Sequence, residues 1–100
     1  MSTEQPLVLI NAFEVPEGSD DGFVAAWESA RDFLETQPGY GGTALHQTVS
    51  PDSEFRFMNV ASWRTAEEFQ AAVTSDEFRA AAAGLAQYRS HPGLYRVVGR

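Results

Sequence analysis

Apolar residues follow two different periods in the first forty positions of the chain. The segment Leu7–Val15 is rich in apolar residues and is followed by Pro-Glu-Gly, which predicts a strand and then a turn. From Ser19 onward the apolar residues recur at helical spacing, with Ser19 or Asp20 as the N-cap. A Pro-Gly pair predicts that this helix ends near Gln37.

The middle of the chain has the pattern of a β-hairpin. The segment Tyr40–Val49 predicts a weaker strand, because Gly41 and Gly42 lower its strand propensity and indicate a bulge or a close backbone approach. After the turn Ser-Pro-Asp-Ser-Glu, the segment Phe55–Arg64 predicts the second arm of the hairpin. One face of this arm carries the alternate residues Phe55, Phe57, Asn59, Ala61 and Trp63.

Two capped segments predict the remaining helices. Thr65 and Glu68 form a capping box, so we expect a short helix that runs to about Val73. A serine cap with acidic residues behind it then starts a second helical segment, expected to reach about Tyr88. Ser-His-Pro-Gly ends this segment, and Leu94–Gly99 predicts a short closing strand.

The order strand, helix, strand, strand, helix pair, strand predicts an α+β fold. It is the ferredoxin-like βαββαβ unit, an antiparallel four-stranded sheet with its helices on one face. We expect one domain over residues 1–100, in which 1–6 form a flexible tail. The other sheet face is mostly apolar, so we expect a homodimer through that face, a dimeric α+β barrel. The positions on that face include Val8, Ile10, Met58, Val60 and Val98.

Composition and charge narrow the choice of partners. The 14 acidic and 7 basic residues give a net charge of -7, which opposes phosphate backbones and anionic lipid. We therefore expect neither nucleic acid nor a membrane as a partner. Cysteine is absent, which excludes a disulfide framework and a thiolate nucleophile. The first residues lack a basic segment and a long apolar run, which predicts a cytoplasmic protein without a signal peptide.

Two asparagines interrupt otherwise apolar strand faces. Asn11 and Asn59 lie on the first and third predicted strands, which are the adjacent central pair in this topology, so their amides can approach each other. One interpretation is structural: the amides bond each other or a buried water and fix the register. The other is functional: the amides and the indole N–H of Trp63 line a cavity and stabilise a substrate oxygen that becomes negative.

The two histidines show no metal-site spacing, and we expect no metal. His46 lies in a strand on the parity of Tyr40, where it is either a packing residue or a general acid, base or substrate contact. His91 precedes a proline and is expected to be a solvated turn residue.

Four segments of the chain resemble one known family. "LINAFEVPEG", "FLETQPGYGGTALHQ", "FRFMNVASWRTAEEFQAAV" and "SDEFRA" together look like the antibiotic biosynthesis monooxygenase family of dimeric α+β barrel proteins, over about residues 7–98. Within that family, anthrone oxygenases have two asparagines and a tryptophan that match Asn11, Asn59 and Trp63. The resemblance implies oxidation of a phenol or anthrone to a quinone by O₂ with no cofactor. The implied partners are a small aromatic substrate and O₂.

The sequence also departs from the pattern of those relatives. Phe69 stands where some quinone-forming relatives have a tyrosine, and alanines stand where they have an arginine, so Arg79 is the nearest helical arginine. The haem-degrading branch of the family would need a tryptophan at Ala72 and a histidine at Ala81 or Ala82. The resemblance therefore disfavours haem degradation.

These observations support three hypotheses about function. The first is a cofactor-independent monooxygenase of aromatic polyketide biosynthesis with Asn11, Asn59 and Trp63 as catalytic residues. The second is a non-catalytic small-molecule-binding protein of the same fold, and the third is a polyketide cyclase or isomerase. In each case the residues expected to contact the ligand are His46, Trp27, Phe69, Phe78 and Arg79.

Overall fold

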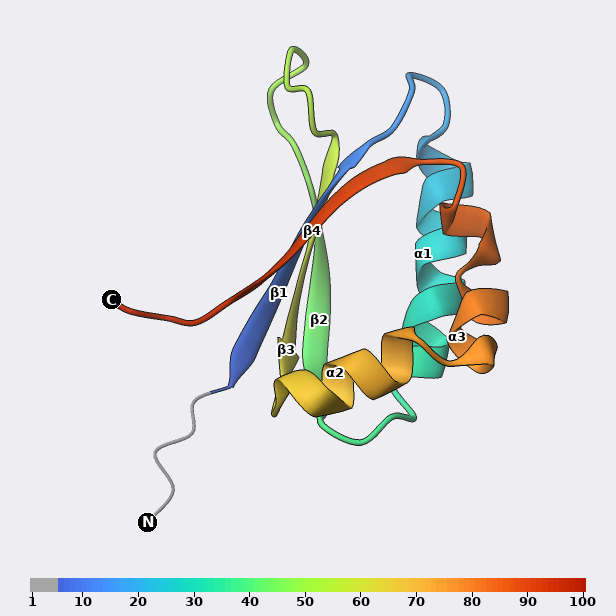
Figure 1. Cartoon of the computed structure of the whole chain (residues 1–100). Helices are drawn as coiled ribbons and strands as arrows, with labels where there is room; N and C mark the ends of the chain where they lie inside the picture. Colours follow the sequence, from blue (N-terminus) through green and yellow to red (C-terminus); the bar gives the residue numbers. More distant parts are fainter. Residues whose placement is uncertain (1–5) are drawn as a thin grey trace.

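The computed structural model of the chain describes residues 6–100, and in it one antiparallel sheet carries its helices on a single face (Figure 1). Of the predicted flexible tail, residues 1–5 lie outside the described part. The elements are β1 (Leu7–Glu14), α1 (Asp20–Leu34), β2 (Tyr40–Gln47), β3 (Phe57–Trp63), α2 (Ala66–Val73), α3 (Asp76–Ala81), the 3₁₀ turn η1 (Ala83–Leu85) and β4 (Arg89–Tyr95).

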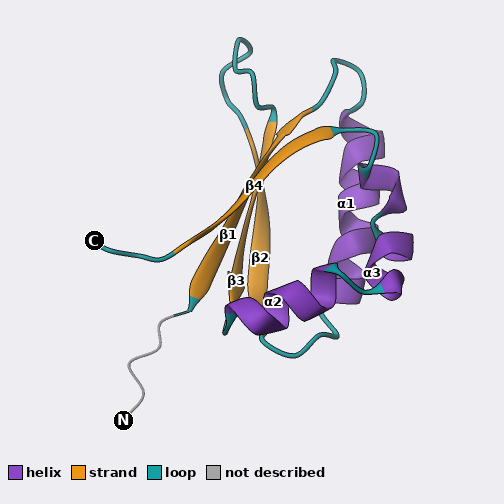
Figure 2. Cartoon of the chain, in the orientation of Figure 1, coloured by secondary structure: helices purple, strands orange, loops and turns teal. Residues whose placement is uncertain are grey.

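The sheet has the strand order β2-β3-β1-β4, with every neighbouring pair antiparallel. The central strands β1 and β3 are in a register that places Asn11 opposite Asn59. Figure 2 shows all the helices on the same side of this twisted sheet. The predicted ferredoxin-like βαββαβ fold and its central strand pair are therefore confirmed.

Local sequence signals set the helix starts. The Thr65 hydroxyl accepts a hydrogen bond from the backbone N–H of Glu68, which is the N-cap half of the predicted capping box, while the Glu68 carboxylate accepts from the side chains of Arg64 and Thr65. Ser75 caps α3 in the same way through the N–H of Phe78. Ser19 occupies the N-cap position of α1 but makes no side-chain cap bond. The start of α1 is instead held by Asp20, whose two carboxylate oxygens each accept a 2.7 Å hydrogen bond from Arg56.

The core has two buried clusters under the helices. One is centred on Trp63, which is 1% exposed, and the other on Phe23, which is fully buried. Burying a large apolar side chain contributes about 1.5–3 kcal/mol, so these two clusters anchor the helices to the sheet. The buried face of β3 contributes to both clusters, with Phe57 in one and Ala61 and Trp63 in the other. Asn59 lies between Phe57 and Ala61 on that face. The amide is thus held on the buried face of the sheet.

A β-bulge at Gly41 and Gly42 changes which face the rest of β2 presents. Tyr40 pairs with Trp63, yet Thr43 pairs with Ala61, so β2 has one residue more than β3 in this interval. Gly42 has a φ of 107°, which favours glycine, and a Cβ on Gly41 would lie 3.1 Å from the Cβ of Ser62. The bulge and close approach predicted from this glycine pair are confirmed.

The bulge corrects the predicted position of His46. Beyond it, Thr43 shares the helix-covered face with Tyr40, while His46 pairs with Met58 and lies on the exposed sheet face. The prediction that His46 has the parity of Tyr40 is wrong, because the extra residue reverses the alternation of side chains.

The C-terminal elements also differ from the predicted ranges. The closing strand is Arg89–Tyr95 rather than Leu94–Gly99, and the preceding helix ends at Ala81 instead of reaching Tyr88. His91 therefore lies in a strand rather than in a turn, and its Nε2 is 2.7 Å from a carboxylate oxygen of Glu14. Pro92 is tolerated inside β4 because β4 is an edge strand. The arm predicted to begin at Phe55 starts at Phe57.

The sheet face away from the helices is open in the single chain. Met58 in β3 is 38% exposed, and Tyr95 at the end of β4 is 54% exposed. The sheet-to-sheet homodimer that this face predicts stays a prediction. No helix within residues 6–100 combines the length and apolarity needed to cross a membrane.

Candidate active site

A cavity of about 250 Å³ lies between the sheet and the helices. Its floor comes from all four strands, with β4 contributing only Pro92, and its walls come from the helices and the 3₁₀ turn η1. The lining residues are Leu9, Asn11, Trp27, Ala30, Arg31, Leu34, Tyr40, Thr43, Asn59, Ala61, Trp63, Phe69, Val73, Phe78, Leu85 and Pro92.

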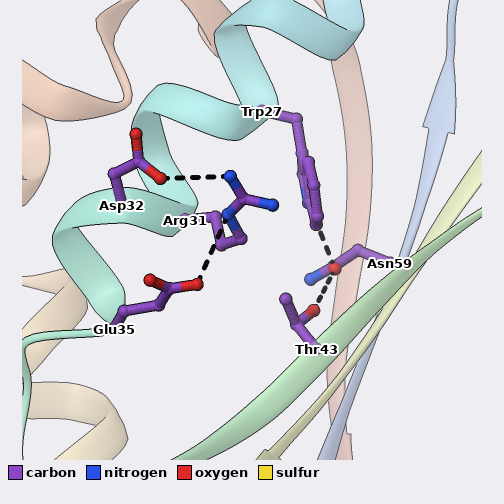
Figure 3. Close-up of polar contacts among 6 residues, drawn as sticks. All are labelled: Trp27, Arg31, Asp32, Glu35, Thr43 and Asn59. Carbon is purple, nitrogen blue, oxygen red and sulfur yellow. Dashed lines mark hydrogen bonds and ion pairs between the residues drawn. The ribbon is translucent and has the colours of Figure 1, made fainter.

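The amide of Asn59 is oriented by two donors. The indole Nε1 of Trp27 donates to Asn59 Oδ1 over 3.1 Å, and the hydroxyl of Thr43 lies 2.5 Å from the same oxygen (Figure 3). An indole N–H can only donate, so the atom facing Trp27 is the amide oxygen and the amino group points the other way. Asn59 is 9% exposed and its oxygen is engaged, so its amino group is an available donor of defined orientation.

Thr43 couples this amide to the backbone of β3. Its hydroxyl lies 3.0 Å from the carbonyl oxygen of Val60 as well as close to Asn59 Oδ1. The hydroxyl has a single proton, so it donates to one of these two acceptors at a time. Thr43 reaches this position only because the Gly41–Gly42 bulge turns it toward the helices.

Trp63 provides a second buried donor. Its indole packs edge-on against Tyr40 and Phe69, with ring centroids 5.5 and 5.6 Å away. The Nε1 atom is buried and has no hydrogen-bond acceptor among residues 6–100. A buried donor without an acceptor costs about 1–3 kcal/mol, so this N–H suits an acceptor supplied by a ligand.

The two asparagine amides do not form a pair. Asn11 and Asn59 face each other across the strands, but the Oδ1 of Asn11 accepts a 3.1 Å hydrogen bond from the backbone N–H of His91. Asn59 uses its oxygen for Trp27 and Thr43 instead. Both amide oxygens are thereby occupied, and both amino groups remain as donors on the cavity lining.

Arg31 is a lining residue that the sequence analysis did not select. Its Nη2 is 3.1 Å from Asp32 Oδ1, its Nε is 3.6 Å from Glu35 Oε1, and its Cζ lies 5.3 Å from the ring centroid of Trp27. The hydrogen bond to Asp32 raises the pKa of Arg31 above its already high value, so the group stays charged. Its helical spacing, four residues after Trp27, was the available signal.

Tyr40 was also missed, because its strand was expected to be irregular. The phenol lines the cavity beside Trp63, and burial raises the pKa of Tyr40 above 10.0. The hydroxyl therefore stays neutral and able to donate near neutral pH.

Six of the eight residues selected from the sequence come together on the cavity lining: Asn11, Asn59, Trp63, Trp27, Phe69 and Phe78. The other two do not. His46 lies on the opposite sheet face with its Nδ1 3.3 Å from the carbonyl oxygen of Met58, and Arg79 is exposed and paired with Asp76. Neither lines this cavity.

The polar chemistry of the cavity is one-sided. Its available donors include the Asn59 amino group and the Trp63 N–H, on an otherwise apolar and aromatic surface, which suits a flat ligand that carries acceptor oxygens. Within residues 6–100, no group of three or more His, Cys, Asp or Glu side chains is arranged to hold a metal ion.

Together, the fold and this cavity define a ferredoxin-like domain with a ligand site between sheet and helices. The model of the antibiotic biosynthesis monooxygenase family matches residues 6–84. The chain belongs to this family, which confirms the resemblance seen in the sequence. A comparison with curated proteins finds no significant match.

Solved structures share the fold over nearly the whole chain. A candidate monooxygenase from Shewanella loihica PV-4 is 33% identical, with a TM-score of 0.84 and coverage of 99% of this chain and 100% of that one. SnoaB from Streptomyces nogalater, a cofactor-independent oxygenase, is 23% identical with a TM-score of 0.82 over 95% of both chains. A candidate antibiotic biosynthesis monooxygenase from Nitrosomonas europaea is 16% identical with a TM-score of 0.78, over 98% of this chain and 95% of that one.

Proposed function

We propose that this chain is a cofactor-independent monooxygenase that oxidises a compact polycyclic phenol or anthrone to a quinone with O₂, in aromatic polyketide biosynthesis. The observation that carries the proposal is two donors on one apolar cavity: the amino group of Asn59, which the bond from Trp27 orients, and the buried Nε1 of Trp63, which is unpaired among the described residues. Membership of the monooxygenase family and the shared fold of SnoaB, a cofactor-independent oxygenase, support it.

The donors act on the oxygen that becomes negative. The anthrone loses a proton from its reactive methylene carbon to solvent water, and the electron pair left behind delocalises onto the carbonyl oxygen. Asn59 and Trp63 donate hydrogen bonds to that enolate oxygen, which lowers the free energy of the anion. One such preorganised donor is worth about 2.7–4 kcal/mol.

The enolate then supplies the electrons for oxygen. One electron passes to O₂, and the resulting substrate radical and superoxide combine to form a C–O bond at the same carbon. After protonation this is a hydroperoxide. Loss of the remaining C–H proton and cleavage of the O–O bond release water and leave the second quinone carbonyl. One oxygen atom enters the product and the other leaves as water, so no further reductant is consumed.

The size of the cavity limits the substrate. A volume of about 250 Å³ is smaller than the roughly 300–1,000 Å³ of pockets for drug-sized ligands. The aromatic walls, Trp27, Phe69 and Phe78 among them, favour a flat ring system, and the small volume favours one of few rings. We therefore expect a substrate of about the size of an unglycosylated anthrone.

The test is oxygen uptake and quinone absorbance with dithranol, with and without a metal chelator. We expect turnover that the chelator does not change. Asn59→Ala and Trp63→Phe should each lower kcat by about a hundredfold or more. Arg79→Gln is the matched control, because Arg79 is exposed and does not line the cavity.

Two results would contradict the proposal in different ways. Tight dithranol binding without oxygen uptake above the spontaneous rate would favour the ligand-binding hypothesis. A product that forms equally well under argon would favour a cyclase or isomerase.

A further inference from the structure

The described lining of the cavity carries a single cation. Among the described residues that line the cavity, Arg31 is the one charged side chain, although the chain as a whole has a net charge of -7. A negative chain repels anions, so an anionic ligand in this cavity would need a specific cationic donor, and Arg31 is the one that the described lining offers.

The position of this guanidinium is determined from two sides. On its outer side, Asp32 and Glu35 hold Nη2 and Nε, as Figure 3 shows. On its inner side, the group lies over the ring of Trp27, which in turn holds Asn59. The indole of Trp27 thus contacts both the guanidinium and the Asn59 amide.

Nη1 is the nitrogen atom of Arg31 that remains available to a ligand, because Nη2 bonds Asp32 and the buried Nε faces Glu35. Nε is buried and has no hydrogen bond, because its distance of 3.6 Å to Glu35 exceeds hydrogen-bond length. The structure gives Nη1 no bond to any described residue, and in Figure 3 it points away from the two carboxylates. The Nη1 donor of a permanently charged guanidinium suits one oxygen of a carboxylate or a phenolate oxygen.

We propose that Arg31 is a specificity-determining residue that binds an anionic oxygen substituent of the substrate, a carboxylate or a phenolate, on the ring edge remote from Asn59. The substrate then has at least two acceptor oxygens, one at the Asn59 and Trp63 donors and one at Arg31. This inference rests on the proposed function for the identity of the first oxygen. The second oxygen is inferred from the position of Arg31 alone.

The test measures ligand affinity without turnover. Naphthoate, naphthol and naphthamide, substituted at the same ring carbon, do not undergo the proposed oxidation, and their binding can be followed by quenching of the tryptophan fluorescence. We expect the wild-type protein to bind naphthoate more tightly than naphthamide. The affinity for naphthol is measured at increasing pH. If Arg31 also binds a phenolate, this affinity should rise as the naphthol hydroxyl ionises.

Arg31→Gln should weaken naphthoate binding by roughly tenfold to a hundredfold and leave naphthamide binding within about twofold. Arg31→Lys should keep part of the preference, because it keeps the charge and loses the planar guanidinium that the carboxylates hold in place. Arg79→Gln, an exposed arginine outside the cavity, should change neither affinity. Thermal unfolding of each variant shows that it is folded.

Equal losses for naphthoate and naphthamide in Arg31→Gln would overturn the inference, since Arg31 would then only support Trp27. A wild-type protein that does not prefer naphthoate would overturn it as well. These outcomes are independent of oxygen uptake with dithranol. A failure of the oxygenase proposal is therefore distinguishable from a failure of this one.

Discussion

The indole nitrogen of Trp27 on α1 donates to the amide oxygen of Asn59 on β3 across a distance of 3.1 Å. This bond joins a helix to the central strand of the sheet and fixes which end of the amide faces the cavity. Trp27 is thus a positioning residue for Asn59 as well as part of the cavity wall.

Removal of the Trp27 donor should therefore lower turnover. In Trp27→Phe the Asn59 amide loses the indole donor, keeps only the hydroxyl that Thr43 shares with Val60, and can rotate. We expect kcat with dithranol to fall by about fivefold to tenfold, because a hydrogen bond of this kind contributes about 1 kcal/mol. Thr43→Val should act in the same direction, while Thr43→Ser, which keeps the hydroxyl, should retain most of the activity. Unchanged turnover in both Trp27→Phe and Thr43→Val would show that the amide needs no orienting bond.

Substitutions at Asn11 should separate its structural role from its catalytic one. Asn11→Ala removes the acceptor for the backbone N–H of His91, so we expect a loss of up to about 1 kcal/mol, or roughly 4–8 °C in Tm. Asn11→Asp keeps an acceptor but has no amide N–H. It should recover stability and still show low kcat with dithranol. High activity in Asn11→Asp would restrict the catalytic role to Asn59 and Trp63.

The Asp20–Arg56 pair should make the thermal stability of the protein depend on pH in the acidic range. Hydrogen bonds from Arg56 lower the pKa of Asp20 below its ordinary value of 3.8. The ionised carboxylate is favoured in the folded state, so its contribution is complete well above pH 3.8 and is lost as the pH falls through the lower folded-state pKa. The Tm of wild type should therefore exceed that of Asp20→Asn at neutral pH, and the difference should shrink toward pH 2–3. A difference that does not vary with pH would assign the effect to packing.

The exposed face of the sheet should mediate dimerisation. Met58 lies on that face and is 38% exposed, so Met58→Glu places a charge in the expected interface. Sedimentation velocity should show a dimer for wild type and a shift toward monomer for this variant. Val49→Glu is the control, since Val49 is fully exposed between β2 and β3, outside both strands. A wild-type monomer at micromolar concentration would contradict the predicted dimer.

The sequence alone was sufficient for the fold and for the central part of the site. The alternation that places Asn59 and Trp63 on one face is local, because side chains alternate along any extended strand. The capping box at Thr65 is local as well, since its partner is three residues away. The adjacency of β1 and β3 follows from the topology, which the order of elements defines. These features need no knowledge of long-range packing.

Tertiary structure decided the rest. The glycine pair indicated a bulge, but only the pairing of β2 with β3 shows that it reverses the strand faces, brings Thr43 to Asn59 and sends His46 to the far side. The choice of Arg31 over Arg79 depends on which helix face meets the cavity, and that is set by the packing of α1 and α3 on the sheet. Sequence determined which residues share an element. The contacts between distant elements, which no local pattern encodes, determined which of them surround the cavity.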